Sequence, residues 1–337
     1  MIDSTNNDNS ITTTSTTEEM WIVDTDYSLD DQLVLPYLLN KLNIIAVTVC
    51  GTNTENPIVI KKKIEDDLVN KYSKKDIKVF AGADRPYINY QVELKDEAIF
   101  DTYNYYKTDY SAFKEIENKE NSEKVDIGAK IANIAAVKIT EYVRIHEKKL
   151  NILTLGPLTN ISLAVLIDST IRDKFNNLFI VGGSYNNLGN SGTSAEYNFR
   201  ADPVAAKNVI NYYKNITLFP YELEEQLKLA QVEKIEGFEK IYPVASEILN
   251  ILNQETEENR MKYSLLGLFG GVIVANLEKC TKVKKMRPCD IDIIGRYTRG
   301  AMAIEKYDHI KSGKFNEICI IEDVDVEAFA EIIKSML

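Results

Sequence analysis

The chain has 337 residues, of which 45% are hydrophobic and 27% charged, the usual balance of a globular protein with a large buried core. Its formal net charge of −11 argues against a nucleic-acid partner, because nucleic-acid-binding proteins need a concentrated basic face. The 4 cysteines form no CxxC pair, and we find neither an apolar run that could span a membrane nor a signal-peptide core, so we expect a cytoplasmic protein without a membrane partner.

The chain begins with residues 1–18, which are mostly serine, threonine, asparagine and aspartate. Such a stretch cannot bury enough apolar surface to offset the entropy that is lost on ordering, so we predict a disordered tail. The remaining residues, 19–337, are predicted to form a single domain with one insertion at about 84–124.

From Trp21 onwards, short apolar runs alternate with amphipathic stretches. The apolar runs predict buried strands at Trp21–Val23, Ile44–Val49, Ile77–Phe80, Leu150–Leu155, Leu178–Val181 and Ile216–Phe219. The amphipathic stretches predict helices at Asp31–Lys41, Val59–Tyr72, Ile127–His146, Leu158–Ile167 and Pro203–Tyr213. This alternation indicates an α/β fold with an open, mostly parallel (Rossmann-like) sheet and helices on both faces. Ligands of such folds lie beyond the carboxyl ends of the strands.

The insertion at about 84–124 breaks the alternation. It contains six tyrosines among many charged residues and has poor periodicity. We expect it to lie over the carboxyl edge of the sheet, with its tyrosines in local packing rather than in a platform that stacks on bases.

Four carboxylates follow the first predicted strand within eight residues: Asp24, Asp26, Asp30 and Asp31. Asp26 lies at the predicted strand tip, while Asp30 and Asp31 lie in the first helical turn, where the helix dipole favours anions. That dipole stabilises each charge by only about 1 kcal/mol, so it cannot hold several converging carboxylates alone. A cation can, and ligands that are all oxygen favour Ca²⁺ or Mg²⁺ over zinc.

Two other interpretations of the cluster stay open at this point. In a purely structural one, Asp30 caps the helix and the other carboxylates face solvent. In the second, the cluster is the DxD motif of a haloacid dehalogenase-type phosphatase. That motif usually has Thr or Val where this chain has Ser28, and we find no convincing context for the lysine and the acidic pair that such enzymes also need. The adjacent Asp30 and Asp31 favour a different family.

The stretch from Asp24 to Asp31 resembles the DTDxxxDD motif that opens the first helix of the nucleoside hydrolases. Further segments resemble the inosine-uridine preferring members of this family, in the same order, over about residues 20 to 305. They are Ile45–Gly51, Val79–Pro86, the TLGPLTN-like Leu153–Asn160, the GG…GN…AEFN…DPxAA-like Gly182–Ala206, and Gly295–Gly300. The ordered set implies a nucleoside hydrolase fold.

This resemblance implies a reaction as well as a fold. The family hydrolyses the N-glycosidic bond of ribonucleosides with a Ca²⁺-activated water and releases ribose and base, as purine and pyrimidine salvage requires. The transition state resembles an oxocarbenium ion, so carboxylates around the sugar stabilise the developing charge. The resemblance further implies a small nucleoside or ribosyl ligand as partner and a homo-oligomeric assembly.

The resemblance also assigns the metal ligands. Asp26 would bind Ca²⁺ and take the proton of the attacking water, and Asp31 would bind the same ion through one or both oxygens. The backbone carbonyl of Leu155 would complete part of the shell. Asp24 would brace the loop rather than touch the metal.

The ribose contacts are assigned in the same way. Asp30 would accept a hydrogen bond from one hydroxyl, and Asn190, Glu196 and Asn198 would hold the others, where polar groups of fixed geometry are needed. The structural alternative for Glu196 and Asn198 is a polar turn before the helix that begins at Asp202–Pro203.

The late part of the chain departs from the family pattern. Family members usually carry a His-Asp pair at the start of a late helix, and counting back without gaps from Gly295–Gly300 places it at Leu268–Phe269. Neither an imidazole nor a carboxylate stands there, and His146 and His309 do not replace them by position. Because Ca²⁺ prefers about six to eight oxygens, the loss of one ligand should weaken binding without necessarily abolishing it.

Two functions are therefore carried forward. The first is a divergent, Ca²⁺-dependent nucleoside N-ribohydrolase. The second is a catalytically impaired homologue, or pseudoenzyme, that binds a ligand or has a structural role. Turnover of a panel of nucleosides separates them.

Overall fold

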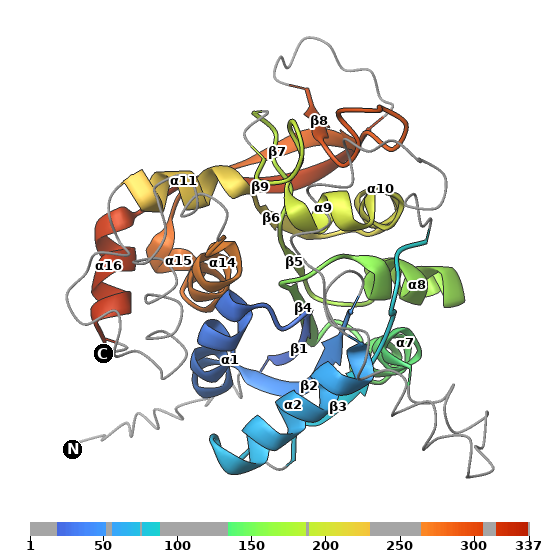
Figure 1. The fold of residues 1–337 in the computed structure, drawn as a ribbon, viewed down its shortest axis with the longest axis vertical. Coiled ribbons are helices and arrows are strands. Elements are labelled where there is room, and N and C mark those ends of the chain that lie inside the picture. The colour runs from blue at the N-terminus through green and yellow to red at the C-terminus, as the bar shows by residue number, and fades with distance from the viewer. Residues whose placement is uncertain are drawn as a thin grey trace, which may run out of the picture.

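A computed structural model of the protein describes residues 19–51, 56–74, 76–87, 134–186, 189–229, 264–305 and 315–335, and within them nine strands form one sheet (Figure 1). The strands are β1 (Met20–Thr25), β2 (Asn43–Val49), β3 (Lys78–Ala81), β4 (Leu150–Thr154), β5 (Leu178–Val181), β6 (Ile216–Phe219), β7 (Thr281–Ile291), β8 (Met302–Ile304) and β9 (Asn316–Val324). Their order across the sheet is β3-β2-β1-β4-β5-β6-β9-β7-β8.

Helices cover both faces of this sheet (Figure 1). They are α1 (Leu29–Lys41), α2 (Pro57–Asn70), α7 (Ala135–Ile145), α8 (Thr159–Ile167), the 3-10 helix η1 (Ser169–Asp173), α9 (Tyr197–Ala201), α10 (Pro203–Tyr212), α11 (Tyr221–Leu229), α14 (Leu266–Ala275), α15 (Leu277–Cys280) and α16 (Val326–Ser335). No helix among the described residues is both long and apolar enough to cross a membrane.

The predicted α/β fold with a mostly parallel sheet is confirmed. β1 to β6 are the six predicted strands, and they pair in parallel with one another, as β6 does with β9. The end of the chain differs from this pattern, because β7 runs antiparallel to both β9 and β8. The predicted tail at 1–18, residues 127–133 of a predicted helix and the insertion beyond Tyr87 lie outside the described residues.

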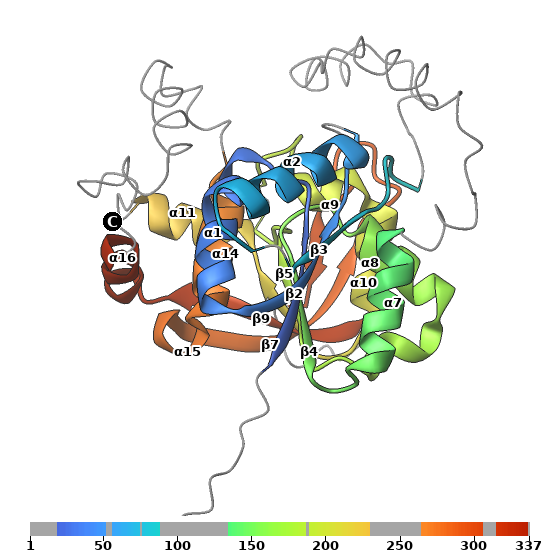
Figure 2. The same cartoon turned by 90° about the horizontal axis from the view of Figure 1, so that it is seen from below.

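Alternating side chains of the strands fill two hydrophobic layers. Trp21 and Val23 of β1 contact the layer formed with α1, α2, α11, α14 and α16, whereas Ile22 between them contacts the layer formed with α7, α8 and α10. Burial on both faces explains why these strands are continuous apolar runs. Figure 2 shows α1 and α14 packed side by side on one face of the sheet, which brings the late helix against the first one.

The order of the strands identifies where a ligand would bind. After β1 the chain adds β2 and β3 on one side, and it then returns to place β4 on the other side of β1. The strand order therefore reverses between β1 and β4, and in open α/β sheets the crevice at such a point, outside the carboxyl ends of the strands, is the usual ligand site. The aspartate cluster begins at the carboxyl end of β1.

Candidate active site

The four aspartates of the cluster are buried at the junction of β1 and α1. Asp24 lies near the end of β1, Asp26 follows the strand, and Asp30 and Asp31 lie in the first turn of α1. Even the most accessible of them is only 9% exposed. The structural interpretation in which the carboxylates face solvent is therefore wrong.

Asp24 ties neighbouring elements together. Its Oδ1 accepts hydrogen bonds from Thr48 Oγ1 of β2 at 2.5 Å and from Asn160 Nδ2 of α8 at 2.9 Å. Asn160 also donates to the Val49 carbonyl and accepts from the Ala83 amide. Burial raises the pKa of Asp24 to about 7. The network joins β1, β2 and α8 directly beneath the cluster.

Asp26 and Asp31 face each other closely enough for their side chains to share a hydrogen bond. Burial and the charge of Asp30 raise the pKa of Asp26 to about 7, and burial with the same neighbouring charge raises that of Asp31. Thr25 Oγ1 donates to Asp31 Oδ2. Among the described residues, no hydroxyl or N–H group donates to Asp31 Oδ1, although this oxygen is buried. Two facing buried carboxylates require either a shared proton or a cation.

Asp30 connects the first helix of the fold to the late helix α14. Its Oδ1 accepts from Ser28 Oγ at 2.5 Å, and its Oδ2 accepts from the backbone amide of Gly267 at 2.7 Å. A Cβ atom at position 267 would overlap Asp31 Oδ1 and would lie 2.7 Å from Asp30 Oδ2. Glycine is therefore the residue that lets α14 approach the aspartates, and it presents a backbone donor to them.

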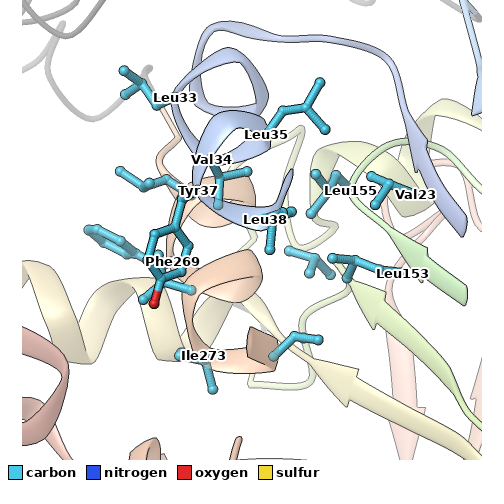
Figure 3. Close-up of a cluster of buried hydrophobic side chains, with 14 of the residues drawn as sticks. Val23, Leu33, Val34, Leu35, Tyr37, Leu38, Leu153, Leu155, Phe269 and Ile273 are labelled. Atoms are coloured by element: carbon cyan, nitrogen blue, oxygen red, sulfur yellow. The ribbon is translucent and has the colours of Figure 1, made fainter. Parts of the chain in front are cut away.

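This geometry corrects the position inferred for the missing His-Asp pair. Phe269 is fully buried in the hydrophobic layer against α1 and packs edge-on against Phe329 of α16, with 5.4 Å between the ring centroids (Figure 3). Leu268 is buried in the same layer. The residue of α14 that reaches the aspartates is Gly267, two positions before Phe269. Counting back from Gly295–Gly300 without gaps ignores any difference in loop length from the family, so the inferred position can be wrong by a few residues. An error of two residues changes the direction of a helical side chain by about 200°.

Leu155 and Asn198 meet beside the cluster. The Leu155 carbonyl accepts from Asn198 Nδ2 at 2.7 Å, and the same nitrogen lies 3.2 Å from the Val181 carbonyl. The next residue, Gly156, lies so close to the loop that a Cβ there would be 2.8 Å from the Asp26 amide nitrogen. The Leu155 carbonyl thus keeps one lone pair for a further contact near Asp26.

Glu196 is buried and caps the short helix α9. Its carboxylate accepts from the backbone amides of Gly183 at 2.8 Å, Asn198 at 2.9 Å and Phe199 at 3.2 Å. Asn190 Oδ1 accepts from the Tyr197 amide at 2.9 Å. These contacts are the ones expected of the structural alternative, a polar turn. A ribose would have to use the remaining lone pairs of the Glu196 carboxylate and the side-chain amide nitrogen of Asn190.

The ionisation of Glu196 should make folding depend on pH. Burial raises its pKa from 4.5 to about 7, so between these values the folded chain keeps a proton that the unfolded chain has lost. Its contribution therefore lowers the free energy of unfolding as pH rises from about 4.5 to 7. We expect Glu196→Gln to reduce this loss, measured by urea unfolding of chelator-treated protein at about pH 5 and pH 7.5. An equal loss in both proteins would mean that Glu196 titrates normally.

The structure thus gathers the residues inferred from the sequence at one edge of the sheet. Asp26, Asp30 and Asp31 form its centre, the Leu155 carbonyl and Asn198 adjoin them, and Glu196 and Asn190 hold the start of α9. The sequence did not indicate Gly267. The signal for it is the set of glycines on α14, where a Cβ at Gly270 or Gly271 would also collide with Val181 or Val34.

The oxygen ligands available at the site are of the type that a hard cation prefers, but they are fewer than Ca²⁺ needs. Asp26, Asp31 and the Leu155 carbonyl offer only oxygen, and Asp31 Oδ1 has no donor. Across the described residues, however, no three Asp, Glu, His or Cys side chains are grouped as a metal site. Ca²⁺ takes about six to eight oxygens, so water or ligand hydroxyls would have to supply the rest.

The family model described as inosine-uridine preferring nucleoside hydrolase matches residues 21–331. Over 102 residues the chain is 37% identical to uridine nucleosidase 1 of Arabidopsis thaliana, an alignment that covers 30% of each protein. Over 170 residues it is 28% identical to the inosine-uridine preferring nucleoside hydrolase of Leishmania major, covering 50% of this chain and 54% of that one. The chain therefore aligns with about a third to a half of the length of these relatives.

Solved structures share the fold over nearly the whole chain. A plant nucleoside hydrolase superposes with a TM-score of 0.69 and 19% identity, covering 94% of this chain and 98% of its own. The inosine-uridine preferring nucleoside hydrolase of Bacillus anthracis gives a TM-score of 0.66 and 17% identity over the same shares. At these identities the likeness establishes the fold.

Proposed function

Because the chain belongs to the inosine-uridine preferring nucleoside hydrolase family, we propose that it hydrolyses the N-glycosidic bond of ribonucleosides and releases ribose and free base. The observation that carries the proposal is the convergence of the buried carboxylates of Asp26, Asp30 and Asp31 where the strand order reverses. Carboxylates placed there can stabilise the positive charge that develops on a ribose ring.

We propose Ca²⁺ as the cofactor, held by Asp26, Asp31 and the Leu155 carbonyl. The buried Asp31 Oδ1 without a donor and the mutual repulsion of the carboxylates support a cation at this point. Ca²⁺ held by these residues would supply Lewis-acid chemistry, lowering the pKa of a water beside the ribose.

The residues of the chain would carry out the following steps. Asp26, a buried carboxylate at the carboxyl end of β1, takes a proton from the attacking water. The water oxygen forms the new bond to the ribose C1′ as the bond to the base nitrogen breaks, and the base leaves with that electron pair and gains a proton from solvent. Asp30 accepts from a ribose hydroxyl through its remaining lone pairs, and Asn190, Glu196 and Asn198 orient the sugar.

A catalytically impaired homologue is the second candidate. It is favoured by α14, which offers the cluster a backbone amide at Gly267 and leucines on either side, with no carboxylate or imidazole. The described residues contain no disulfide, which suits the reducing, cytoplasmic compartment proposed for either function.

Turnover of a nucleoside panel tests the proposal. Inosine, uridine, cytidine, adenosine and guanosine are incubated with the protein in Ca²⁺, and the products are separated by chromatography. The proposal requires free base and free ribose in equal amounts from at least one nucleoside. If every nucleoside is recovered intact but binds, the impaired homologue is favoured.

Binding of Ca²⁺ should also stabilise the fold. A ligand that binds only the folded state raises the unfolding free energy by RT ln(1 + [L]/Kd), about 2.7 kcal/mol at a hundredfold excess over Kd. We expect millimolar Ca²⁺ to raise the melting temperature of the wild type and of Asp173→Asn, a control at an exposed position of η1. The double variant Asp26→Asn, Asp31→Asn should lose this rise. No rise in the wild type would contradict a Ca²⁺ site.

A further inference from the structure

Tyr27, between Asp26 and the start of α1, has an unusual backbone. Its φ is +57°, in the left-handed region that glycine and asparagine enter readily and that a bulky aromatic residue enters at a cost. The turn at Tyr27 directs the chain from the end of β1 into α1, and it therefore sets how Asp26 lies relative to Asp30 and Asp31. Something outside the turn must offset the cost of this conformation.

Three hydrogen bonds hold Tyr27. Its backbone amide donates to Thr25 Oγ1 at 2.8 Å, and its carbonyl accepts from Gln32 Nε2 at 3.1 Å. Thr25 Oγ1 in turn donates to Asp31, so the turn and the cluster share one hydroxyl. The third bond is the long-range one: the Tyr27 hydroxyl donates to Asp67 Oδ2 on α2 at 2.7 Å.

Asp67 is anchored on its own helix. Its other oxygen, Oδ1, lies 2.8 Å from the ammonium of Lys71 one turn later. The Tyr27 ring is 7% exposed and packs in the hydrophobic layer with α1 and α2. A tyrosine hydroxyl is protonated near neutral pH, so Tyr27 is the donor and Asp67 Oδ2 the acceptor of this hydrogen bond. A buried ring fixed at its tip cannot turn without breaking a hydrogen bond to a charged group.

We infer that Asp67 is a positioning residue for the active site: by binding the Tyr27 hydroxyl it holds the left-handed turn that aligns Asp26 with Asp31. The inference rests on the proposed function, to which it adds a residue on α2 that touches neither metal nor ribose. The Asp67 carboxylate of α2 thereby helps to set the relative positions of the Asp26 and Asp31 carboxylates.

Matched variants isolate this hydrogen bond. Tyr27→Phe removes only the hydroxyl, and Asp67→Ala removes the acceptor together with its ion pair to Lys71. Asp67→Asn keeps an acceptor oxygen and is the rescue, while Lys71→Met removes the other partner of Asp67 and is the control. We expect Tyr27→Phe and Asp67→Ala each to weaken Ca²⁺ binding, measured by calorimetry, and to lower kcat by about tenfold with KM little changed. Asp67→Asn and Lys71→Met should stay near the wild type, and the double variant Tyr27→Phe, Asp67→Ala should be no worse than either single one.

Hydrogen exchange supplies a readout that does not depend on activity. In chelated protein, the peptide covering residues 25–33 should exchange faster in Tyr27→Phe and Asp67→Ala, while the peptide covering 135–145 of α7 should not change. Unchanged exchange at 25–33, or an Asp67→Asn variant as impaired as Asp67→Ala, would overturn the inference. A wild type that neither binds Ca²⁺ nor releases ribose would refute the proposed function instead, and the exchange measurement would still decide the role of Asp67.

Discussion

Asp26→Asn is expected to lower kcat/KM for nucleoside hydrolysis by about 10²- to 10⁴-fold, the usual contribution of a general base. Asparagine keeps the size of the side chain and can still offer one oxygen, but it cannot take a proton from water. The same substitution should increase the stability of the fold although it lowers activity. Because burial and Asp30 raise the pKa of Asp26 to about 7, its ionised form above this pH is costly in the cation-free protein, and removing the charge should raise the unfolding free energy.

The two measurements are kcat/KM for the best nucleoside of the panel and urea unfolding of chelated protein at about pH 8. Asp173→Asn is the control, since this aspartate is exposed and outside the cluster. A variant that loses activity together with stability would mean that Asp26 supports the fold. A variant that keeps activity would exclude Asp26 as the base.

Gly267→Asp should make the stability of the protein depend strongly on Ca²⁺. The new Cβ would overlap Asp31 Oδ1 and approach Asp30 Oδ2, and the backbone of α14 leaves it no other direction. Without a cation, an added buried charge among like charges should cost about 3–5 kcal/mol of unfolding free energy, the usual penalty of an uncompensated buried charge. With Ca²⁺ the same carboxylate can become a ligand, and Ca²⁺ affinity responds strongly to ligand charge.

Two further substitutions make this test specific. Gly267→Ala adds only the Cβ. This variant should be less stable than the wild type, and Ca²⁺ should stabilise it no more than it stabilises the wild type. Phe269→Asp places the charge in the hydrophobic layer against Phe329 and should unfold the protein with or without Ca²⁺. A gain of Ca²⁺ affinity in Phe269→Asp and none in Gly267→Asp would restore the position inferred by counting along the sequence.

The first two thirds of the fold could be predicted from the sequence because burial on both faces makes each strand a short, continuous apolar run. The last third could not. β7 has exposed lysines at Lys282, Lys284 and Lys285, so it does not stand out in the sequence as a buried apolar strand. The helix α14 is apolar all round, so its sequence has no helical periodicity to separate it from a strand.

The centre of the site was predictable for a related reason. Asp26, Asp30 and Asp31 are close in sequence and follow the first strand. In open α/β sheets, ligands bind beyond the carboxyl ends of the strands. Gly267 and Asp30 are 237 positions apart in the chain and are joined through a backbone amide. Every residue except proline has such an amide, so the residue type gives no indication of this contact. The predicted sugar contacts, Asn190 and Glu196, lie near the site, but their oxygens are bound to backbone amides that a pattern of residues does not reveal.

The most direct test of Ca²⁺-dependent nucleoside hydrolysis is the release of free ribose by chelator-treated protein, measured with and without added Ca²⁺. We expect wild-type protein to release ribose from inosine or uridine in Ca²⁺ and chelation to suppress this release. Asp26→Asn should release at most about a hundredth as much. Ribose release that is unaffected by chelation would contradict the proposed cofactor. No ribose above the blank in Ca²⁺, from a folded protein that Ca²⁺ stabilises, would contradict catalysis and leave a metal-binding homologue that is not an enzyme.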